Sequence, residues 1–301
     1  MGAQGRVSRI DKRSTAWATS KLRALSSEIL FYSRVAALHF MANPFFRRWV
    51  NLTLCRLRLM LQWLHTLPFR SGKANLPGVF LAYQPDSQRA FGRHPEYLRL
   101  FPRFVAGNEL NQAGDGVRLW SFLLNIKQIL EEKIPGDFAE VGVWRGNTAC
   151  ILAHFAATNG RKAFLFDTFE GFSPRDLKSE NPAHRRAFTD TNLTMVREII
   201  GEAFEACDII KGYFPDSATD AHRSREYAVV SIDCDLYGPI RAALEFFYPR
   251  MPKGGLFLLH DYSSLWWAGA KPAIDEFCRK HGEHVILIPD KAGTAIVRKS
   301  K

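Results

Sequence analysis

Residues 227–262 read YAVVSIDCDLYGPIRAALEFFYPRMPKGGLFLLHDY, and this stretch decides the fold. An apolar run predicts a buried strand over 227–235, a helical pattern follows over 238–251, and a second apolar run predicts a strand over 254–261. Strand, helix and strand in this order form a right-handed unit of a parallel sheet. Both strands end in carboxylates, which are costly to bury unless they have a partner or a ligand.

The same alternation of strands and helices extends to both sides of this stretch. Further strands are predicted over 137–143, 162–167, 207–212, 284–289 and 294–299, and further helices over 116–133, 146–160, 191–204 and 269–282. This alternation predicts an α/β fold with a Rossmann-like, mostly parallel sheet of seven strands. The last two strands are joined only by DKAG, which is too short for a parallel crossover, so we expect an antiparallel hairpin there.

The net charge of +11 comes from the N-terminal quarter of the chain. Residues 1–75 contain 13 Lys and Arg and 2 acidic residues, and the remainder is balanced. The composition predicts three parts. These are a basic, partly helical N-terminal extension over 1–75, a Gly- and Pro-rich linker or lid over 76–115, and the α/β domain over 116–301.

An apolar segment dotted with arginines within the extension leaves two interpretations open. Arg56 and Arg58 at its centre would each cost about 2.5–3.5 kcal/mol in a bilayer, so a membrane span is disfavoured. Residues 1–68 either lie on an anionic membrane surface or form a helical arm that packs on the domain or on a second subunit of a homo-oligomer. No nucleic-acid partner is expected, because no DNA- or RNA-binding motif accompanies the charge.

Cysteine usage indicates a reducing compartment. The five cysteines are scattered without a CxxC spacing, which argues against a disulfide framework and against a structural zinc site. No signal-peptide pattern opens the sequence. We therefore expect a cytoplasmic protein, peripheral to the inner face of a membrane if the extension binds there.

Every strand of the parallel set ends in polar or glycine residues, at the edge where open α/β sheets bind ligands. The first strand leads into Gly142 and Gly146, whose spacing completes neither a dinucleotide fingerprint nor a phosphate loop. Glu140 can accept hydrogen bonds from a ligand's ammonium, and Asp167 is placed to bind ribose hydroxyls. S-adenosylmethionine, with an adenosine and an amino-acid end, fits these groups. The expected cofactor-binding residues are Glu140, Gly142, Gly146, Asn147, Thr148, Asp167 and Thr168.

Several stretches of the chain carry a resemblance to a known family. They are FAEVGVWRGNTA at 138–149, LFDTFEGF at 165–172, KGYFPDS at 211–217, the block at 232–262 and KPAIDEF at 271–277. Over roughly residues 100–300 the chain resembles the macrocin O-methyltransferase family, whose members are S-adenosylmethionine-dependent sugar O-methyltransferases. The resemblance implies the seven-stranded sheet of class I methyltransferases, on which the last hairpin is also antiparallel.

The resemblance also implies an acceptor site. In the family the substrate chelates Mg²⁺, and the matching ligand positions here are Asp233, His260 and Asp261, with Asp233 also taking the proton. The family carries Asp where this chain has His260, and imidazole favours softer ions than Mg²⁺. A weaker magnesium site, another divalent cation, and a metal-free site with His260 as general base therefore all stay open.

Three further residues near this site have expected roles. Asp235 is expected to face away from Asp233 and to support the site or cap the following helix. Trp266 and Trp267 lie in the loop after HDYSS and are candidates for stacking on a sugar or aromatic acceptor.

The sequence thus predicts an S-adenosylmethionine-dependent O-methyltransferase that acts on a hydroxyl of a sugar or glycosylated small molecule, with Asp233 and His260 as catalytic residues. Two other classes remain as alternatives. One is a nucleotide-sugar or dinucleotide enzyme on a Rossmann-like sheet. The other is a non-catalytic scaffold at a membrane surface that keeps the fold.

Overall fold

The computed structural model describes residues 93–107, 115–177, 187–264 and 266–301. The predicted basic extension over 1–75, for which the sequence leaves both a membrane surface and a packing arm open, lies outside the described residues. The chain divides into two compact units, Met1–Tyr83 and Gln84–Lys301. Only the second contains described residues, and all that follows concerns it.

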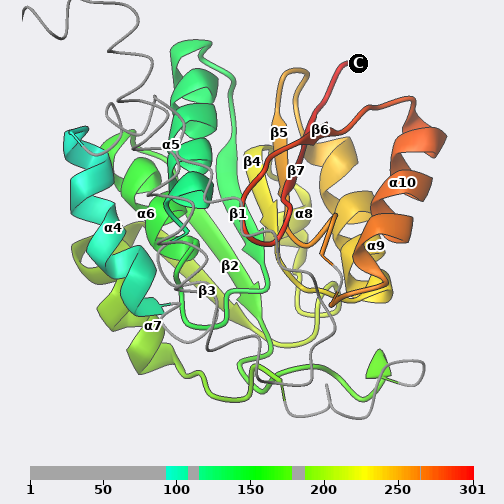
Figure 1. The fold of residues 1–301 in the computed structure, drawn as a ribbon, viewed down its shortest axis with the longest axis horizontal. Coiled ribbons are helices and arrows are strands. Elements are labelled where there is room, and N and C mark those ends of the chain that lie inside the picture. Colours follow the sequence, from blue (N-terminus) through cyan, green and yellow to red (C-terminus); the bar gives the residue numbers. More distant parts are fainter. Residues whose placement is uncertain (1–92, 108–114, 178–186, 265) are drawn as a thin grey trace, which may run out of the picture. The chain divides into compact units, whose positions relative to one another are not determined.

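The second unit alternates strands and helices as predicted (Figure 1). The strands are β1 (Asp137–Val141), β2 (Ala163–Asp167), β3 (Cys207–Lys211), β4 (Tyr227–Ile232), β5 (Leu256–Leu259), β6 (Ile286–Leu287) and β7 (Ala295–Arg298). The helices are α4 (Pro95–Gly107), α5 (Gly116–Glu131), α6 (Ala149–Thr158), α7 (Leu193–Ile200), α8 (Asp220–Arg223), α9 (Tyr237–Phe247) and α10 (Ala270–His281), with short 3₁₀ turns η3 (Gly201–Ala206) and η4 (Tyr248–Arg250).

The seven strands form one sheet in the order β3-β2-β1-β4-β5-β7-β6. Strands β1 to β5 are parallel, and β7 is antiparallel to both β5 and β6. The predicted mostly parallel, seven-stranded sheet with an antiparallel closing hairpin is confirmed. Because the strand order reverses between β1 and β4, the carboxyl ends of these two strands are the expected place for a ligand.

Alternation of side chains along the strands divides the core into two layers. Phe138 of β1 belongs to the cluster that contains Leu119 of α5 and Ile151 of α6. Val141, on the other face of the same strand, belongs to the cluster that contains Ile240 of α9 and Ile274 of α10. Helices α4, α5, α6 and α7 therefore cover one face of the sheet, and α9 and α10 cover the other (Figure 1).

Part of the range predicted as a linker or lid is a helix. Helix α4 buries Tyr97, Leu100 and Phe104 in the same layer as α5 and α6, despite the proline at position 102. Its apolar residues recur at helical spacing, so the Gly- and Pro-rich composition around it hid a packed element. Among the described helices, none combines the length and apolarity needed to cross a bilayer.

Candidate active site at the carboxyl ends of the strands

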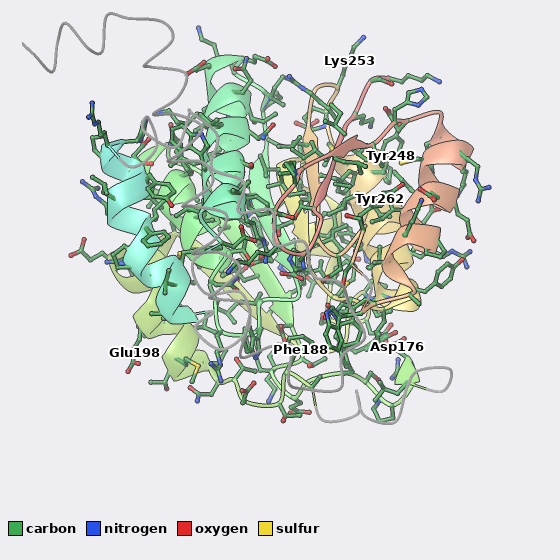
Figure 2. The ribbon with its side chains drawn as sticks, viewed as in Figure 1. Asp176, Phe188, Glu198, Tyr248, Lys253 and Tyr262 are labelled. Carbon is green, nitrogen blue, oxygen red and sulfur yellow. The ribbon has the colours of Figure 1, made fainter. Side chains whose placement is uncertain are left out.

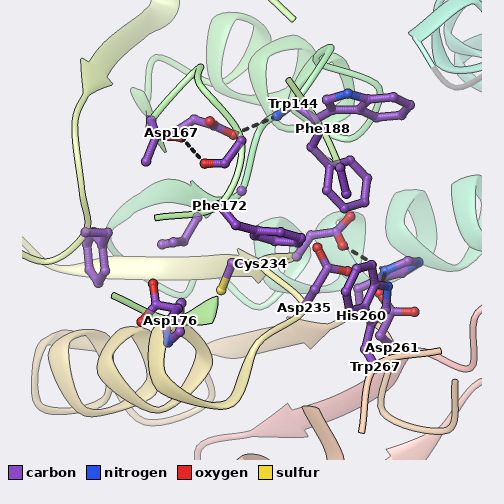
Figure 3. Close-up of a pocket in the computed structure, with 18 of the residues that line it drawn as sticks. Trp144, Asp167, Phe172, Asp176, Phe188, Cys234, Asp235, His260, Asp261 and Trp267 are labelled. Carbon is purple, nitrogen blue, oxygen red and sulfur yellow. Dashed lines mark hydrogen bonds and ion pairs between the residues drawn. The ribbon is translucent and has the colours of Figure 1, made fainter. Parts of the chain in front are cut away.

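A pocket of about 910 Å³ opens at the carboxyl ends of the parallel strands. Its lining residues Asp176 and Phe188 lie at one end of the molecule, whereas Lys253, which precedes β5, lies at the opposite end (Figure 2). Figure 3 shows Asp167 and Trp144 at one side of the pocket and Asp235, His260, Asp261 and Trp267 at the other, with Phe172 between them. We call the first side the loop half and the second the acid half.

The loop half begins where β1 turns sharply toward α6. Gly142 has φ +90°, and a Cβ on it would lie 2.1 Å from the carbonyl oxygen of Asp233. Only glycine allows so close an approach of the loop to β4. Gly146 also has a positive φ, of +88°, but it does not line the pocket.

Asp167 at the end of β2 holds this loop from the neighbouring strand. One carboxylate oxygen accepts hydrogen bonds from the backbone N–H of Val143 at 2.7 Å and of Trp144 at 2.8 Å. The other oxygen accepts from the N–H of Phe169 at 2.6 Å. Asp167 therefore fixes the backbone of the loop, and with about four acceptor sites on a carboxylate it keeps room for one more donor in the pocket.

Residues 187–191, which we call the strap, line the loop half and hydrogen-bond the loop after β1. Ala187 and Phe188 line the pocket, while Asp190 accepts hydrogen bonds from the indole N–H of Trp144 at 2.9 Å and from the guanidinium of Arg145 at 2.5 Å. Thr191 donates to the carbonyl oxygen of Trp144. The strap thus hydrogen-bonds the same loop whose backbone Asp167 fixes from β2.

The structure corrects the role expected for Glu140. Its side chain is fully buried beneath the pocket, accepts a hydrogen bond from the Ser231 hydroxyl at 3.1 Å, and is not among the residues that line the pocket. The physical reason is alternation: Glu140 shares the face of β1 that carries Phe138, so it points into the layer of α5 and α6. Burial, together with the charge of Asp233, raises the pKa of Glu140 to about 8.

The acid half is organised around a buried arginine that sequence reasoning missed. Asp115 caps α5 by accepting from the N–H of Arg118 at 3.2 Å, and its other oxygen accepts from the N–H of Lys291 at 3.1 Å. This anchored first turn places the fully buried Arg118 guanidinium 2.6 Å from Oδ2 of Asp233 and 3.4 Å from the hydroxyl of Thr148.

Arg118 had a signal in the sequence. It occupies the first position of a helical stripe that continues with Phe122, Ile126 and Ile129, all buried. A charged residue on the buried stripe of a helix needs a partner, because an unpaired buried charge is strongly destabilising. The position predicts a buried ion pair, but only the fold reveals that Asp233 is the partner, 115 residues away.

His260 joins the acids of β4 and β5. Ile232 and Leu259 are paired in the sheet. Asp233 and His260 come directly after them, so they lie side by side at the ends of the two strands. The Nδ1 atom of His260 lies 2.8 Å from Oδ1 of Asp233 and 2.6 Å from Oδ2 of Asp261. Nδ1 therefore faces two carboxylate oxygens, one from each strand end.

The charges of this group shift the pKa values in opposite directions. Burial would raise the pKa of Asp233, but the charges of His260 and Arg118 outweigh it and hold the pKa well below its usual range. Burial and Arg118 lower the pKa of His260, but Asp233 and Asp261 outweigh them and raise it to about 9. Within this group of residues His260 is thus a hydrogen-bond donor, which disfavours the general-base role, one of the three possibilities that the sequence leaves open.

Asp235 supports the site as expected, but it neither faces away from Asp233 nor caps the following helix. The strand ends at Ile232, and Asp235 turns back with φ +60°, so strand alternation no longer applies to it. It lines the pocket beside Asp233, hydrogen-bonds Asp261 and does not cap α9, whose N-cap is Leu236. Burial, followed by the charges of Asp261 and Asp233, raises the pKa of Asp235 well above its ordinary value.

Aromatic rings from two connections of the chain, the one between β2 and α7 and the one after β5, form a wall in the pocket. We call Phe172, Phe188 and Trp267 the aromatic wall; their ring centroids lie 5.4 Å apart for Phe172 with Phe188, 5.4 Å for Phe172 with Trp267 and 6.0 Å for Phe188 with Trp267. All three line the pocket, as does Trp266, whose side chain is 80% exposed. Apolar ring faces beside carboxylates suit an acceptor with both apolar and hydroxyl surface.

The residues of the acid half fit a divalent cation. Asp233, His260 and Asp261 each offer one ligand atom, and these atoms lie within 4.8 Å of one another. Two carboxylate oxygens and one imidazole nitrogen are a common donor set for a divalent ion, and the pocket leaves positions open for further ligands. Arg118 on the second oxygen of Asp233 is the kind of outer partner that ligating carboxylates have.

The structure brings together most of the predicted site residues. Those that line the pocket are Gly142, Asn147, Asp167, Thr168, Asp233, His260 and Asp261. Glu140, Gly146 and Thr148 do not line it; they lie behind the pocket wall. Lining residues that sequence reasoning missed include Arg118, Trp144, Phe172, Asp176 and Phe188.

Comparison with known proteins agrees with this geometry. The family model described as Macrocin-O-methyltransferase (TylF) matches residues 114–294. This range spans more than half of the chain and includes every pocket residue named above, so the chain belongs to that family.

Two curated relatives and one solved structure illustrate the similarity. An 8-demethyl-8-(2,3-dimethoxy-alpha-L-rhamnosyl)-tetracenomycin-C 4'-O-methyltransferase of Streptomyces olivaceus is 28% identical over 46% of this chain and 57% of its own length. Mycinamicin III 3''-O-methyltransferase of Micromonospora griseorubida is 28% identical over 52% of this chain and 66% of its own length. This chain thus spans less than two thirds of either relative. The O-methyltransferase NovP superposes with a TM-score of 0.54 at 22% identity, covering 68% of this chain and 99% of NovP, and supports the fold.

Proposed function

We propose that this protein is an S-adenosylmethionine-dependent O-methyltransferase that methylates a hydroxyl of a sugar or glycosylated small molecule. One observation carries the proposal. A single pocket joins a glycine loop fixed by Asp167 to a cluster of carboxylates around Asp233, in a chain of the macrocin O-methyltransferase family. The names of the relatives supply the acceptor class, since one of them acts on a rhamnosyl-bearing compound.

The loop half is the proposed cofactor site. Asp167 keeps one acceptor position for a ribose hydroxyl, and Asn147 and Thr168 add polar groups to the lining. Bound there, S-adenosylmethionine supplies an electrophilic methyl group on a sulfonium. Ala187 and Phe188 of the strap add apolar lining to this half, which would help to exclude water from a bound ligand.

The acid half is the proposed acceptor site. Asp233 stays ionised because Arg118 and His260 pair with it, so it accepts a hydrogen bond from the acceptor hydroxyl and orients the attacking oxygen. Alignment of the reacting oxygen supplies a large part of the rate in such displacements. A carboxylate with so low a pKa is a weak base, so Asp233 takes the proton late, as the new carbon–oxygen bond forms.

Asp233, His260 and Asp261 are also the proposed ligands of a divalent cation. Such an ion would lower the pKa of an acceptor hydroxyl and thereby ease loss of its proton. The aromatic wall, with Trp267 nearest to His260, is the proposed surface for the apolar face of the sugar (Figure 3).

Calorimetric titration of the full chain tests the proposal. We expect S-adenosylmethionine to bind at least 100-fold more tightly than NAD, and Asp167→Ala to abolish the difference. Asp176→Ala is a matched control, because this acid also lines the pocket but hydrogen-bonds Tyr213 instead of the loop. NAD binding without S-adenosylmethionine binding would identify a dinucleotide enzyme, and binding of neither would indicate a scaffold.

A further inference from the structure

The geometry points to His260 as the residue that sets the metal preference of the acid half: the site binds a first-row transition ion such as Mn²⁺, Fe²⁺, Co²⁺ or Zn²⁺ in preference to Mg²⁺. The inference concerns the acceptor side of the proposed methyltransferase and in that sense rests on the proposed function. Three features of the described residues support this metal preference.

The first feature is the arrangement of the ligand atoms. Nδ1 of His260 lies 2.8 Å from one oxygen of Asp233 and 2.6 Å from one oxygen of Asp261. A single proton on Nδ1 would be shared by two carboxylate oxygens, and a cation can take its place. The ligands come from the ends of the paired strands β4 and β5, so the sheet itself holds them together.

The second feature is the outer support of both carboxylates. Arg118 occupies Oδ2 of Asp233 at 2.6 Å, which leaves Oδ1 as the single oxygen turned toward His260. Asp261 is hydrogen-bonded by Asp235. Asp233 is thus held as a one-oxygen ligand and Asp261 has an outer partner, and the orientation of a metal ligand by such partners strengthens binding.

The third feature is the chemistry of the donor set. Mg²⁺ prefers six oxygen ligands in near-ideal octahedral geometry, and the cluster offers nitrogen as its central donor. Imidazole suits the later divalent ions of the first transition row. The donor set therefore favours an ion that bonds to nitrogen.

Competition between Co²⁺ and Mg²⁺ on chelator-stripped full-length protein tests the inference, with the visible absorption of bound Co²⁺ as the readout. Most sites prefer Co²⁺ to Mg²⁺, so the decisive quantity is how the ratio of the two affinities changes in variants. We expect His260→Asp to reduce the Co²⁺ preference at least tenfold. His284→Asp, at an exposed histidine outside the pocket, should leave it unchanged.

A second measurement needs no variant. Electron spin echo spectra of the protein loaded with Mn²⁺ should contain modulation from one directly coordinated nitrogen. Absence of that modulation, an unchanged affinity ratio in His260→Asp, or no Co²⁺ binding at all would each overturn the inference. Titration with S-adenosylmethionine in the same samples separates the two proposals. Retained cofactor binding without metal binding would refute only the metal preference, whereas lost cofactor binding would refute the methyltransferase.

Discussion

In the loop half of the pocket the strand-end acid Asp167 binds backbone N–H groups, whereas in the acid half the strand-end acid Asp233 binds charged side chains. Asp167 accepts hydrogen bonds from three backbone N–H groups and thereby fixes the turn after β1. Asp233 is instead paired with Arg118 and His260. Carboxylates at strand ends can therefore either shape a loop or hold charge, and the residue type alone does not tell which.

Replacement of Arg118 should have the largest effect on stability and on methyl transfer. Arg118→Met leaves the partly buried Asp233 beside His260 without its second cation. Loss of one partner of a buried pair costs about 3–5 kcal/mol of unfolding free energy, and we expect the lower end of this range because the Asp233 side chain is 18% exposed. We also expect methyl transfer to fall at least 100-fold. Chemical denaturation and a transfer assay measure the two effects.

The matched control is Arg175→Met, whose partner Asp216 is exposed, and which should change the unfolding free energy by less than about 1 kcal/mol. Addition of Asp233→Asn to Arg118→Met should recover part of the lost stability. If the double variant is no more stable than the single one, the two residues do not act as a pair.

A methyl group on the glycine loop should have the next largest effect. In Gly142→Ala the new Cβ meets the carbonyl of Asp233 at a left-handed backbone angle, so we expect a loss of about 2–4 kcal/mol and of cofactor binding. Gly160→Ala has a similar angle, φ +64°, but no atom within 4 Å, and should cost only about 1–2 kcal/mol. Equal losses in the two variants would show that the close approach to β4 is unimportant.

Replacement of Glu140 should raise the unfolding free energy, in contrast to the losses expected above, and the gain should depend on pH. Burial raises its pKa from 4.5 to about 8, so the folded state keeps a proton that the unfolded chain releases. The stability that this group contributes is full below pH 4.5 and is lost as pH rises through about 8. Glu140→Gln should therefore gain up to about 3 kcal/mol at pH 7 and nothing at pH 4.

Glu283→Gln is the control for that prediction. Burial would raise the pKa of Glu283, but hydrogen bonds from the N–H of Ser300 and the hydroxyl of Tyr248 outweigh it and lower the pKa. Its stability contribution is present above the ordinary pKa and is lost as pH falls. The variant should thus lose stability at pH 7, and a gain like that of Glu140→Gln would contradict the electrostatic explanation.

Loss of the hydrogen bonds between the strap and the loop after β1 should have the smallest effect, a modest fall in cofactor affinity. Asp190→Ala removes the hydrogen bonds to Trp144 and Arg145, but the Asp190 side chain is more than half exposed, so the bonds are weak. We expect S-adenosylmethionine affinity to fall about two- to fivefold by calorimetry, since 1 kcal/mol corresponds to roughly fivefold. Asp216→Ala removes a comparable exposed pair and should not alter affinity.

The fold could be predicted from the sequence because its signals are local and periodic. Apolar runs of strand length, helical stripes and the short DKAG connection each depend on neighbouring residues. Helix α4 escaped prediction because Gly, Pro and Ser around it resemble a linker. Of the site, the rule that ligands bind at strand ends located Gly142, Asp167, Asp233 and His260.

The remainder of the site depends on orientation and on contacts between distant residues. Glu140 lies one residue before the last residue of β1, and alternation turns it into the core. Asp235 faces the pocket because its backbone reverses at φ +60°, an angle that its sequence does not demand. Arg118 meets its partner across 115 residues, and one sequence contains no signal for such a pairing.

The division of the pocket into a cofactor half and an acceptor half is tested most directly by one variant, Asp233→Asn, measured in two assays. The full chain is titrated with S-adenosylmethionine, and transfer of its labelled methyl group to a panel of rhamnosylated compounds is followed. We predict that the variant binds S-adenosylmethionine within threefold of the wild-type affinity but transfers methyl at least 100-fold more slowly. A variant that transfers as fast as the wild type, or that loses cofactor binding while it remains folded, would contradict the account.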